Sequence, residues 1–313
     1  MTRKVKQFFN VKSFKDFANG LDIPVTDSAG VLIKENLKHI DPTIFEKKYP
    51  ALAFLNSGIQ ADNSGGYSQV VESLRTLGQG EFKTSGDRSS DKGKISLKGE
   101  TNLIQVISRE AESEWSESDL QTAALQNINI QQKLLGYHLE QYQREVDAII
   151  ANGVADKAGS VGLLNNSDFA TAASGDTIDN LTGIQAYEAI ASCITDQHNA
   201  VNNTPEYMAN AVMLPVNIYN HISREILNSA GSEKTILSAL KVNFPDVAFY
   251  VSFRATKVCA YSTSGEAMKI RIPLALTVSP IVRLGFKYKV ESNYRIAGLD
   301  ILESSAGRYL TGL

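Results

Sequence analysis

The side chains best suited to nucleophilic, acid–base or metal chemistry are few and scattered in this chain. Its 313 residues include four histidines and two cysteines. They stand singly, at His39, His138, His198, His221, Cys193 and Cys259. A zinc site would need such residues at short, regular spacings, as in CxxC or HExxH. The sequence therefore predicts no metal site, and both cysteines are expected to be buried in a protein kept in a reduced compartment.

Other catalytic patterns are equally weak. Gly78-Gln79-Gly80 begins a GxGxxG-like run, but Lys83 fills the third glycine position and no helix start follows. No GxSxG elbow or GKS/T phosphate loop is present. An acidic run could attract a cation, although a favourable position before a helix explains it more simply. This run comprises Glu110, Glu112, Glu114 and Glu117. We predict no catalytic residue and no cofactor.

The overall composition is that of an ordinary globular protein. Hydrophobic residues make up 43% and charged residues 21% of the chain. The net charge of −3 gives no global basic field toward nucleic acid or a membrane. The longest apolar runs, such as Ile272 to Val278, fall short of the roughly 20 residues of a membrane span. The first 15 residues are basic and phenylalanine-rich, unlike a secretory signal, and indicate either a solvated terminus or an arm that docks on another subunit.

The clearest elements are a hairpin and a long helix. Residues 67–107 are predicted to form two strands around the polar, turn-rich segment 85–94. Because an isolated hairpin has little stability, it is expected to pack against its own domain or a partner. Ser116 to Asp119 forms a capping-box pattern that opens a short helix. A second helix is predicted from about Ile130 to Asn152, with Gly153 as its stop. Trp115 is expected to anchor the hairpin base to this helix.

The second half of the chain mixes helices and strands. Thr182 and Gln185 form another capping box at the start of a helix, and Ala211 to Leu214 reads as a buried strand. Ser264-Gly265-Glu266 is predicted to turn one strand into the next as a hairpin. From Ile281 to the end the pattern is that of strands. The expected fold class is α+β.

Several motifs occur in an order that is known from one family. Trp115-Ser116-Glu117-Ser118-Asp119-Leu120 leads into the long helix, Asp147 to Gly153 follows a D-x-I-x-x-x-G pattern, and Gly162-Leu163-Leu164-Asn165 comes next. Near the end, Arg295 to Leu302 is similar to closing strands of the same proteins. The chain thus resembles the major capsid proteins of tailed bacteriophages, with the Hong Kong 97-type fold, and the related encapsulin shells.

The resemblance implies a division into parts. Residues 1–64 would form an N-terminal arm and the entry to the peripheral (P) domain, and 65–108 the E-loop hairpin. Residues 109–175 would hold the P-domain with its spine helix, 176–275 the axial (A) domain, and 276–313 the closing strands of the P-domain sheet. Intersubunit contacts are expected at the E-loop tip, from Asp87, Arg88, Asp91, Lys92 and Lys94.

The same resemblance implies a structural function. The chain would assemble with itself into hexamers and pentamers of an icosahedral head around double-stranded DNA, without sequence-specific contact to it. A separate scaffolding protein, a portal and decoration proteins would be further partners, and assembly would take place in the bacterial cytoplasm before the protein resides in the virion. Two alternatives stay open from sequence alone: an encapsulin-like nanocompartment shell and a soluble hydrolase.

Overall fold

The computed structural model describes residues 49–83, 93–125, 128–154, 157, 160–228 and 234–313. Residues Tyr49–Leu313 form one compact unit. Most of the predicted N-terminal arm lies outside the described residues. No helix in the described part of the chain is long and apolar enough to span a membrane.

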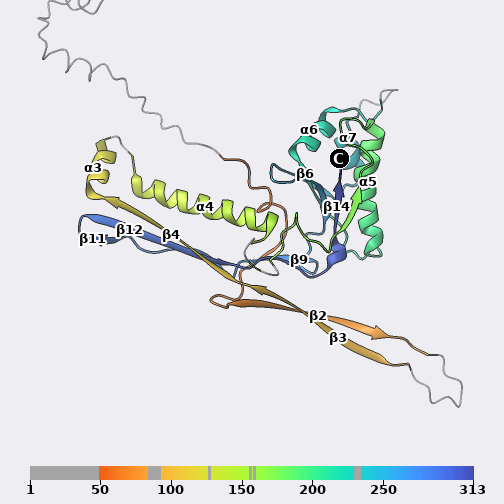
Figure 1. The fold of residues 1–313 in the computed structure, drawn as a ribbon, viewed down its shortest axis with the longest axis horizontal. Helices are drawn as coiled ribbons and strands as arrows, with labels where there is room; N and C mark the ends of the chain where they lie inside the picture. Colours follow the sequence, from red (N-terminus) through yellow and green to blue (C-terminus); the bar gives the residue numbers. More distant parts are fainter. Residues whose placement is uncertain (1–48, 84–92, 126–127, 155–156, 158–159, 229–233) are drawn as a thin grey trace, which may run out of the picture. The chain divides into compact units, whose positions relative to one another are not determined.

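The predicted hairpin is confirmed. Strands β2 (Val70–Gly80) and β3 (Ile95–Gln105) pair antiparallel along their whole length, from Val70 opposite Gln105 to Gly80 opposite Ile95. After Val106 the chain continues directly into β4 (Ile107–Ser116), so the hairpin and the next sheet share one nearly continuous strand (Figure 1).

A sheet built on β4 supports the long helix. Strand β4 pairs with one edge of β12 (Lys287–Ile296) over ten residue pairs. The other edge of β12 pairs with β10 (Leu274–Val278) and β11 (Val282–Leu284). Helix α4 (Ile130–Asn152) runs alongside this sheet (Figure 1). The rings of Tyr142 on α4 and Tyr294 on β12 meet edge to face, 4.8 Å apart, which fixes the helix on the sheet.

The start of α3 and the end of α4 follow the predicted caps. The Ser116 backbone N–H donates to Asp119 Oδ2 at 2.9 Å, at the start of α3 (Glu117–Leu125). Asn129 caps α4, and Gly153 ends it with a φ of 71°, a backbone conformation that favours glycine. These local signals confirm the predicted bounds of α4.

A second sheet has five strands, of which β6 and β8 are buried on both faces. Its order is β5-β14-β8-β6-β7. The strands are β5 (Ala170–Ala173), β6 (Ala211–Pro215), β7 (Ala248–Ser252), β8 (Val258–Tyr261) and β14 (Gly307–Thr311). Residues that alternate along β6 and β8 enter two different apolar clusters. One cluster includes the last turns of α4, and the other includes α5 (Gly183–Ala200), α6 (Val216–Arg224) and α7 (Ile236–Asn243).

A small third sheet joins distant parts of the chain. Its order is β1-β9-β13, in which β1 (Ala61–Asp62) lies parallel and β13 (Gly298–Ile301) antiparallel to β9 (Met268–Arg271). A short 3-10 helix, Ser304–Ala306, then leads into β14.

Three sequence expectations are wrong. Strands β8 and β9 do not form a hairpin around Gly265, because they belong to different sheets. The last strand, β14, does not close the sheet under the long helix, as expected for residues 276–313, but pairs with β5 and β8. Trp115 lies at the far end of β4 from the hairpin and stacks on Tyr288 of β12, with ring centroids 6.1 Å apart.

Candidate functional site

The polar hairpin tip lies almost wholly outside the described residues. Asp87, Arg88, Asp91 and Lys92 fall in the segment 84–92, whereas Lys94 precedes β3 and is exposed. Their part in contacts between subunits therefore stays a prediction.

One face of the hairpin is an exposed apolar surface. Directly opposed residues of an antiparallel pair point to the same side of the ribbon, and the register of β2 and β3 therefore groups their apolar side chains. We define the apolar hairpin face as Val70, Leu74, Ile95, Leu97 and Leu103. These side chains are between 46% (Val70) and 75% (Leu97) exposed. Large exposed apolar side chains gathered on one face of a strand pair indicate a candidate interaction site.

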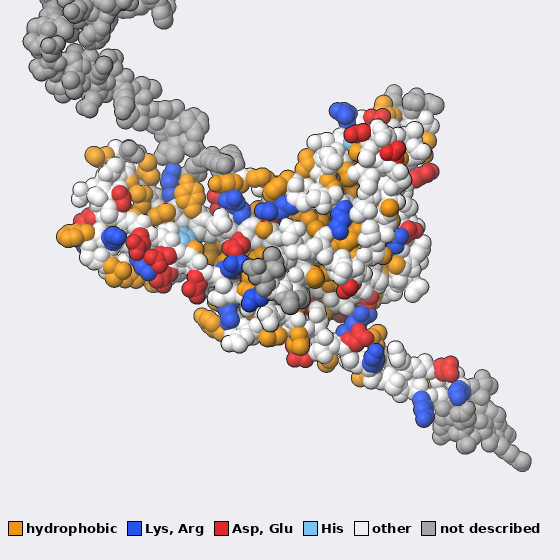
Figure 2. Space-filling model, viewed as in Figure 1, with side chains coloured by type: hydrophobic (Ala, Val, Ile, Leu, Met, Phe, Trp, Pro, Cys, Tyr) orange, Lys and Arg blue, Asp and Glu red, His pale blue; other side chains and the backbone are white. Residues whose placement is uncertain are grey.

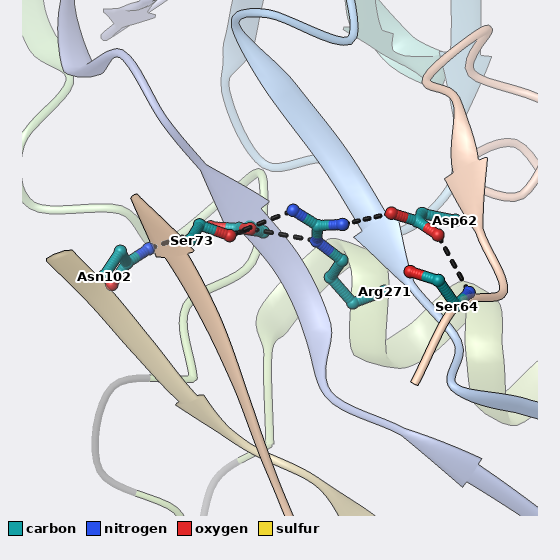
Figure 3. Close-up of polar contacts among 6 residues, drawn as sticks. Asp62, Ser64, Ser73, Asn102 and Arg271 are labelled. Atoms are coloured by element: carbon teal, nitrogen blue, oxygen red, sulfur yellow. Dashed lines mark hydrogen bonds and ion pairs between the residues drawn. The ribbon is translucent and has the colours of Figure 1, made fainter. Parts of the chain in front are cut away.

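The opposite face of the hairpin, which also holds the buried Ile104, binds the body of the same subunit through polar side chains near its root (Figure 3). Asn102 of β3 donates to Asp300 Oδ1 at 2.9 Å, and the Ser73 hydroxyl of β2 donates to Asp300 Oδ2. Arg271 of β9 donates from Nε to Asp300 Oδ2 at 3.0 Å and from Nη2 to Ser73 Oγ at 2.9 Å. Arg271 also forms an ion pair with Asp62 of β1. We call these five residues the root network.

The acidic run of β4 is matched by basic side chains in the same sheet. Lys289 Nζ lies 2.7 Å from Glu112 and 2.9 Å from Glu291. Hydrogen bonds to these two carboxylates raise the pKa of Lys289. Lys287 pairs with Glu114 at 3.6 Å, so cross-strand ion pairs neutralise Glu112 and Glu114 of this run. Figure 2 shows acidic and basic side chains intermixed over the face in view.

A second apolar surface lies at the turn between β11 and β12. Val282, Leu284 and Phe286 are 49%, 58% and 79% exposed. We call these three residues the β11–β12 end. Because large apolar side chains gather there next to a tight turn, this end is a second candidate contact surface.

His138 is the histidine best placed for chemistry, but its partners indicate a structural role. It is buried on α4, with Nε2 2.8 Å from the Ser113 hydroxyl and Nδ1 2.7 Å from the Ser292 hydroxyl. A serine nucleophile is activated by a histidine that a third group, usually a carboxylate, orients. Here the third group is another serine, and the ring cross-links α4 to β4 and β12.

Replacing His138 with leucine is expected to lower the free energy of unfolding by about 1–3 kcal/mol, because two hydroxyls, one of them buried, lose a partner. Urea unfolding of the unassembled subunit measures this loss. Tyr137→Leu, the half-exposed neighbour, is the matched control and should change stability by no more than about 0.5 kcal/mol. Equal effects of both substitutions would show that the His138 hydrogen bonds contribute nothing.

The two cysteines are buried, as the sequence predicts. Burial raises the pKa of the Cys193 thiol to about 11 and raises that of Cys259 well above its usual range. Thiols held in this protonated form are poor nucleophiles and poor metal ligands. Within the described part of the chain, no three His, Cys, Asp or Glu side chains gather as a metal site would require.

Comparison with known proteins decides the family. A family model described as major capsid protein matches residues 80–313. The chain belongs to the major capsid protein family. Among solved structures, the capsid of Myoviridae Phage XM1 is 42% identical, with a TM-score of 0.81 over 89% of this chain and 98% of that one. A search of curated proteins gives no match.

More distant solved structures share the fold at low identity. The capsid of an empty GTA particle is 13% identical with a TM-score of 0.62, and it matches 92% of this chain and 99% of that one. A structure from Mycobacterium phage Ogopogo is 12% identical with a TM-score of 0.60 over the same shares of the two chains. These matches confirm the predicted α+β, Hong Kong 97-type fold of this capsid protein.

Sequence reasoning missed two features of the major capsid protein that its structure reveals. The apolar hairpin face could have been found from the alternation of Leu74 and Leu97 with polar residues. The root network could not, because Ser73 and Asp300 are 227 positions apart and no local pattern links them.

Proposed function

We propose that this chain is the shell subunit of a tailed-phage head, which assembles as hexamers and pentamers into an icosahedral shell around double-stranded DNA. One observation carries the proposal: 42% identity to a phage capsid over 89% of this chain. The match to the major capsid protein family over residues 80–313 supports it independently.

The two apolar surfaces supply contacts for such a shell. The apolar hairpin face turns away from its own subunit, whose contacts use the opposite face of the hairpin. A second copy is its proposed partner, and the β11–β12 end would meet further copies. The tip residues Asp87, Arg88, Asp91, Lys92 and Lys94 would extend the hairpin contact. Many modest contacts repeated around a shell stabilise it in sum. Each single contact stays weak enough for a misplaced subunit to dissociate during assembly.

The division into parts stays a proposal, with changes that the sheets suggest. We assign α3, α4 and the sheet of β4 and β10–β12 to the P-domain, and the five-stranded sheet with α5–α7 to the A-domain. The A-domain would then include β14. Residues 65–108 would be the E-loop. The small β1-β9-β13 sheet would lie at the junction of these parts.

Further partners follow from the same proposal. A separate scaffolding protein, a portal and decoration proteins would bind the shell, and assembly in the bacterial cytoplasm would precede residence in the virion. The packaged DNA would lie beside the subunit without sequence-specific contact. The net charge of −3 and the intermixed surface charges (Figure 2) support this last point, because neither supplies a basic field for DNA.

Size-exclusion chromatography and negative-stain electron microscopy of the purified full chain test the proposal. Hollow shells, tubes or hexameric rings are the expected result. A subunit that stays monomeric at high concentration, even with the phage's own scaffolding protein added, would contradict it.

Replacing Leu97 with aspartate tests the apolar hairpin face. The subunit should keep its stability within about 0.5 kcal/mol, because Leu97 is 75% exposed before assembly. Burying the new carboxylate against a second copy should cost at least about 2 kcal/mol per contact, which raises the concentration needed for assembly more than about tenfold. Light scattering during assembly measures this threshold.

The matched control is Gln79→Asp, at a neighbouring position on the opposite face of the same hairpin. It adds the same charge and should leave the threshold near that of the unmodified protein. Equal thresholds for the two variants would show that assembly does not bury the apolar hairpin face.

A further inference from the structure

The direction in which the hairpin leaves the body is set by few contacts. A two-stranded ribbon has little stability or stiffness of its own. Ser73 and Arg75 of β2 and Asn102 of β3 bind the body directly. From Thr76 to Phe82 and from Ile95 to Thr101, the hydrogen bonds and ion pairs shown by the described residues stay within the hairpin. The anchorage is therefore confined to the root.

Asp300 makes this anchorage specific. Its side chain is completely buried, and a buried carboxylate is costly unless hydrogen-bond donors surround it. Of its three side-chain donors, Ser73 and Asn102 come from the hairpin and Arg271 from the body. A hairpin that swings away removes two of these donors at once. One orientation of the hairpin relative to the body is therefore favoured over other orientations.

Three residues of the root network, Asp62, Arg271 and Asp300, belong to the body and contact one another without the hairpin. Arg271 lies between Asp62 and Asp300 and forms ion pairs with both. Hydrogen bonds from Ser64, and then the charge of Arg271, lower the pKa of Asp62 and keep it ionised. Arg75 of the hairpin adds a second link between the hairpin and the body, because it pairs with Glu303 and donates to the Leu302 carbonyl at 3.1 Å. Removing the hairpin-side partners therefore leaves the two ion pairs of Arg271 within the body in place.

We infer that the root network orients the hairpin before assembly, with Asp300 as the positioning residue, so that the apolar hairpin face is already aimed at the next subunit. This inference rests on the proposed shell function and deepens it. If the hairpin samples many directions, the subunit binds the next subunit more weakly. The apparent affinity falls in proportion to the fraction of subunits whose hairpin has the direction needed for binding. The root network raises that fraction without itself touching a partner.

The test measures the hairpin direction in the isolated subunit. Spin labels are attached to Gln79→Cys on the hairpin and Glu188→Cys on α5, both exposed, while the native cysteines are buried and react slowly. Electron–electron resonance then gives the distribution of distances between the labels. The test variant is Ser73→Ala/Arg75→Ala/Asn102→Ala, which removes only hairpin-side partners. The matched control is Thr76→Ala/Lys98→Ala, farther out on the same strands.

We expect a narrow distribution for the unmodified protein and the control, and one at least about twice as broad for the test variant. Its assembly rate should fall by about tenfold if the competent direction drops to a tenth of the population. Circular dichroism confirms that the body stays folded, and the single change Asn102→Ala, expected to act in the same direction, replaces the triple variant if it does not.

An equally narrow distribution in the test variant, or a broad one in the unmodified protein, would overturn the inference. A broadened distribution with an unchanged assembly rate would overturn its link to assembly. Failure of the proposed function is distinguishable, because the unmodified protein would then form no shells whatever its label distances are.

Discussion

Replacing Asp147 with alanine is expected to lower the free energy of unfolding of the subunit by about 3–5 kcal/mol. Asp147 lies on α4 with a side chain only 1% exposed. Its Oδ1 accepts hydrogen bonds from the backbone N–H groups of Phe54 (2.8 Å) and Leu55 (3.1 Å), and its Oδ2 accepts one from Arg254 Nε (3.2 Å). Alanine would leave two backbone N–H groups without an acceptor and Arg254 without its ion-pair partner, which is the costly way to break a buried pair.

This carboxylate holds three distant segments together: the long helix, the chain before β1 and the loop after β7. Chemical unfolding followed by the fluorescence of Trp115, the single tryptophan, measures the loss. Asp147→Asn should cost less, because its carbonyl oxygen still accepts from the two N–H groups. Gln141→Ala, exposed on the same helix, is the control, with an expected change within about 0.5 kcal/mol. A loss for Asp147→Ala no larger than that of the control would contradict the assigned role.

Gly162→Ala is expected to destabilise the subunit by about 3 kcal/mol. A Cβ at this position would lie 2.4 Å from the Ala151 carbonyl oxygen and 2.4 Å from the Asn152 nitrogen. Both are backbone atoms of the last turn of α4 and cannot rotate away. The loop would have to move off the helix end, and its hydrogen bonds to that end would be lost.

Those hydrogen bonds explain the Gly-Leu-Leu-Asn motif physically. The N–H groups of Leu163 and Leu164 donate to the carbonyls of Ile150 and Ala151 at 2.8 and 2.9 Å. They satisfy acceptors that a helix end otherwise leaves free. Asn165 adds a donation from Nδ2 to the Asn152 carbonyl at 2.6 Å. The glycine permits the approach, and the next three residues close the helix.

Gly136→Ala is the matched control for this prediction. Gly136 lies within α4, is exposed, and a Cβ there would meet nothing within 4 Å. Alanine should stabilise the helix by about 0.5–1 kcal/mol. Thermal unfolding of both variants in the unassembled state should therefore move in opposite directions. A stable Gly162→Ala subunit would show that the loop has room to shift.

The sequence by itself determined the elements whose signals are local. The hairpin followed from strand patterning around a polar turn, and the end of α4 from Gly153, because capping acts within one turn of the chain. The motif order from Trp115 to Asn165 indicated the family, which the match over residues 80–313 confirms. The scattered histidines and cysteines predicted no catalytic site, and the serine partners of His138 agree with a structural role for that residue.

Only the tertiary structure decided how these elements pair. The turn at Ser264 to Glu266 has the composition of a hairpin turn, yet its flanking strands enter different sheets, because β8 is already paired on both edges by β6 and β14. The root network brings Ser73 of the hairpin to Asp300 across 227 positions. Turn and capping preferences act over a few residues, whereas strand partners and buried charges are selected by packing between segments far apart in the chain, and that selection leaves no local pattern to read.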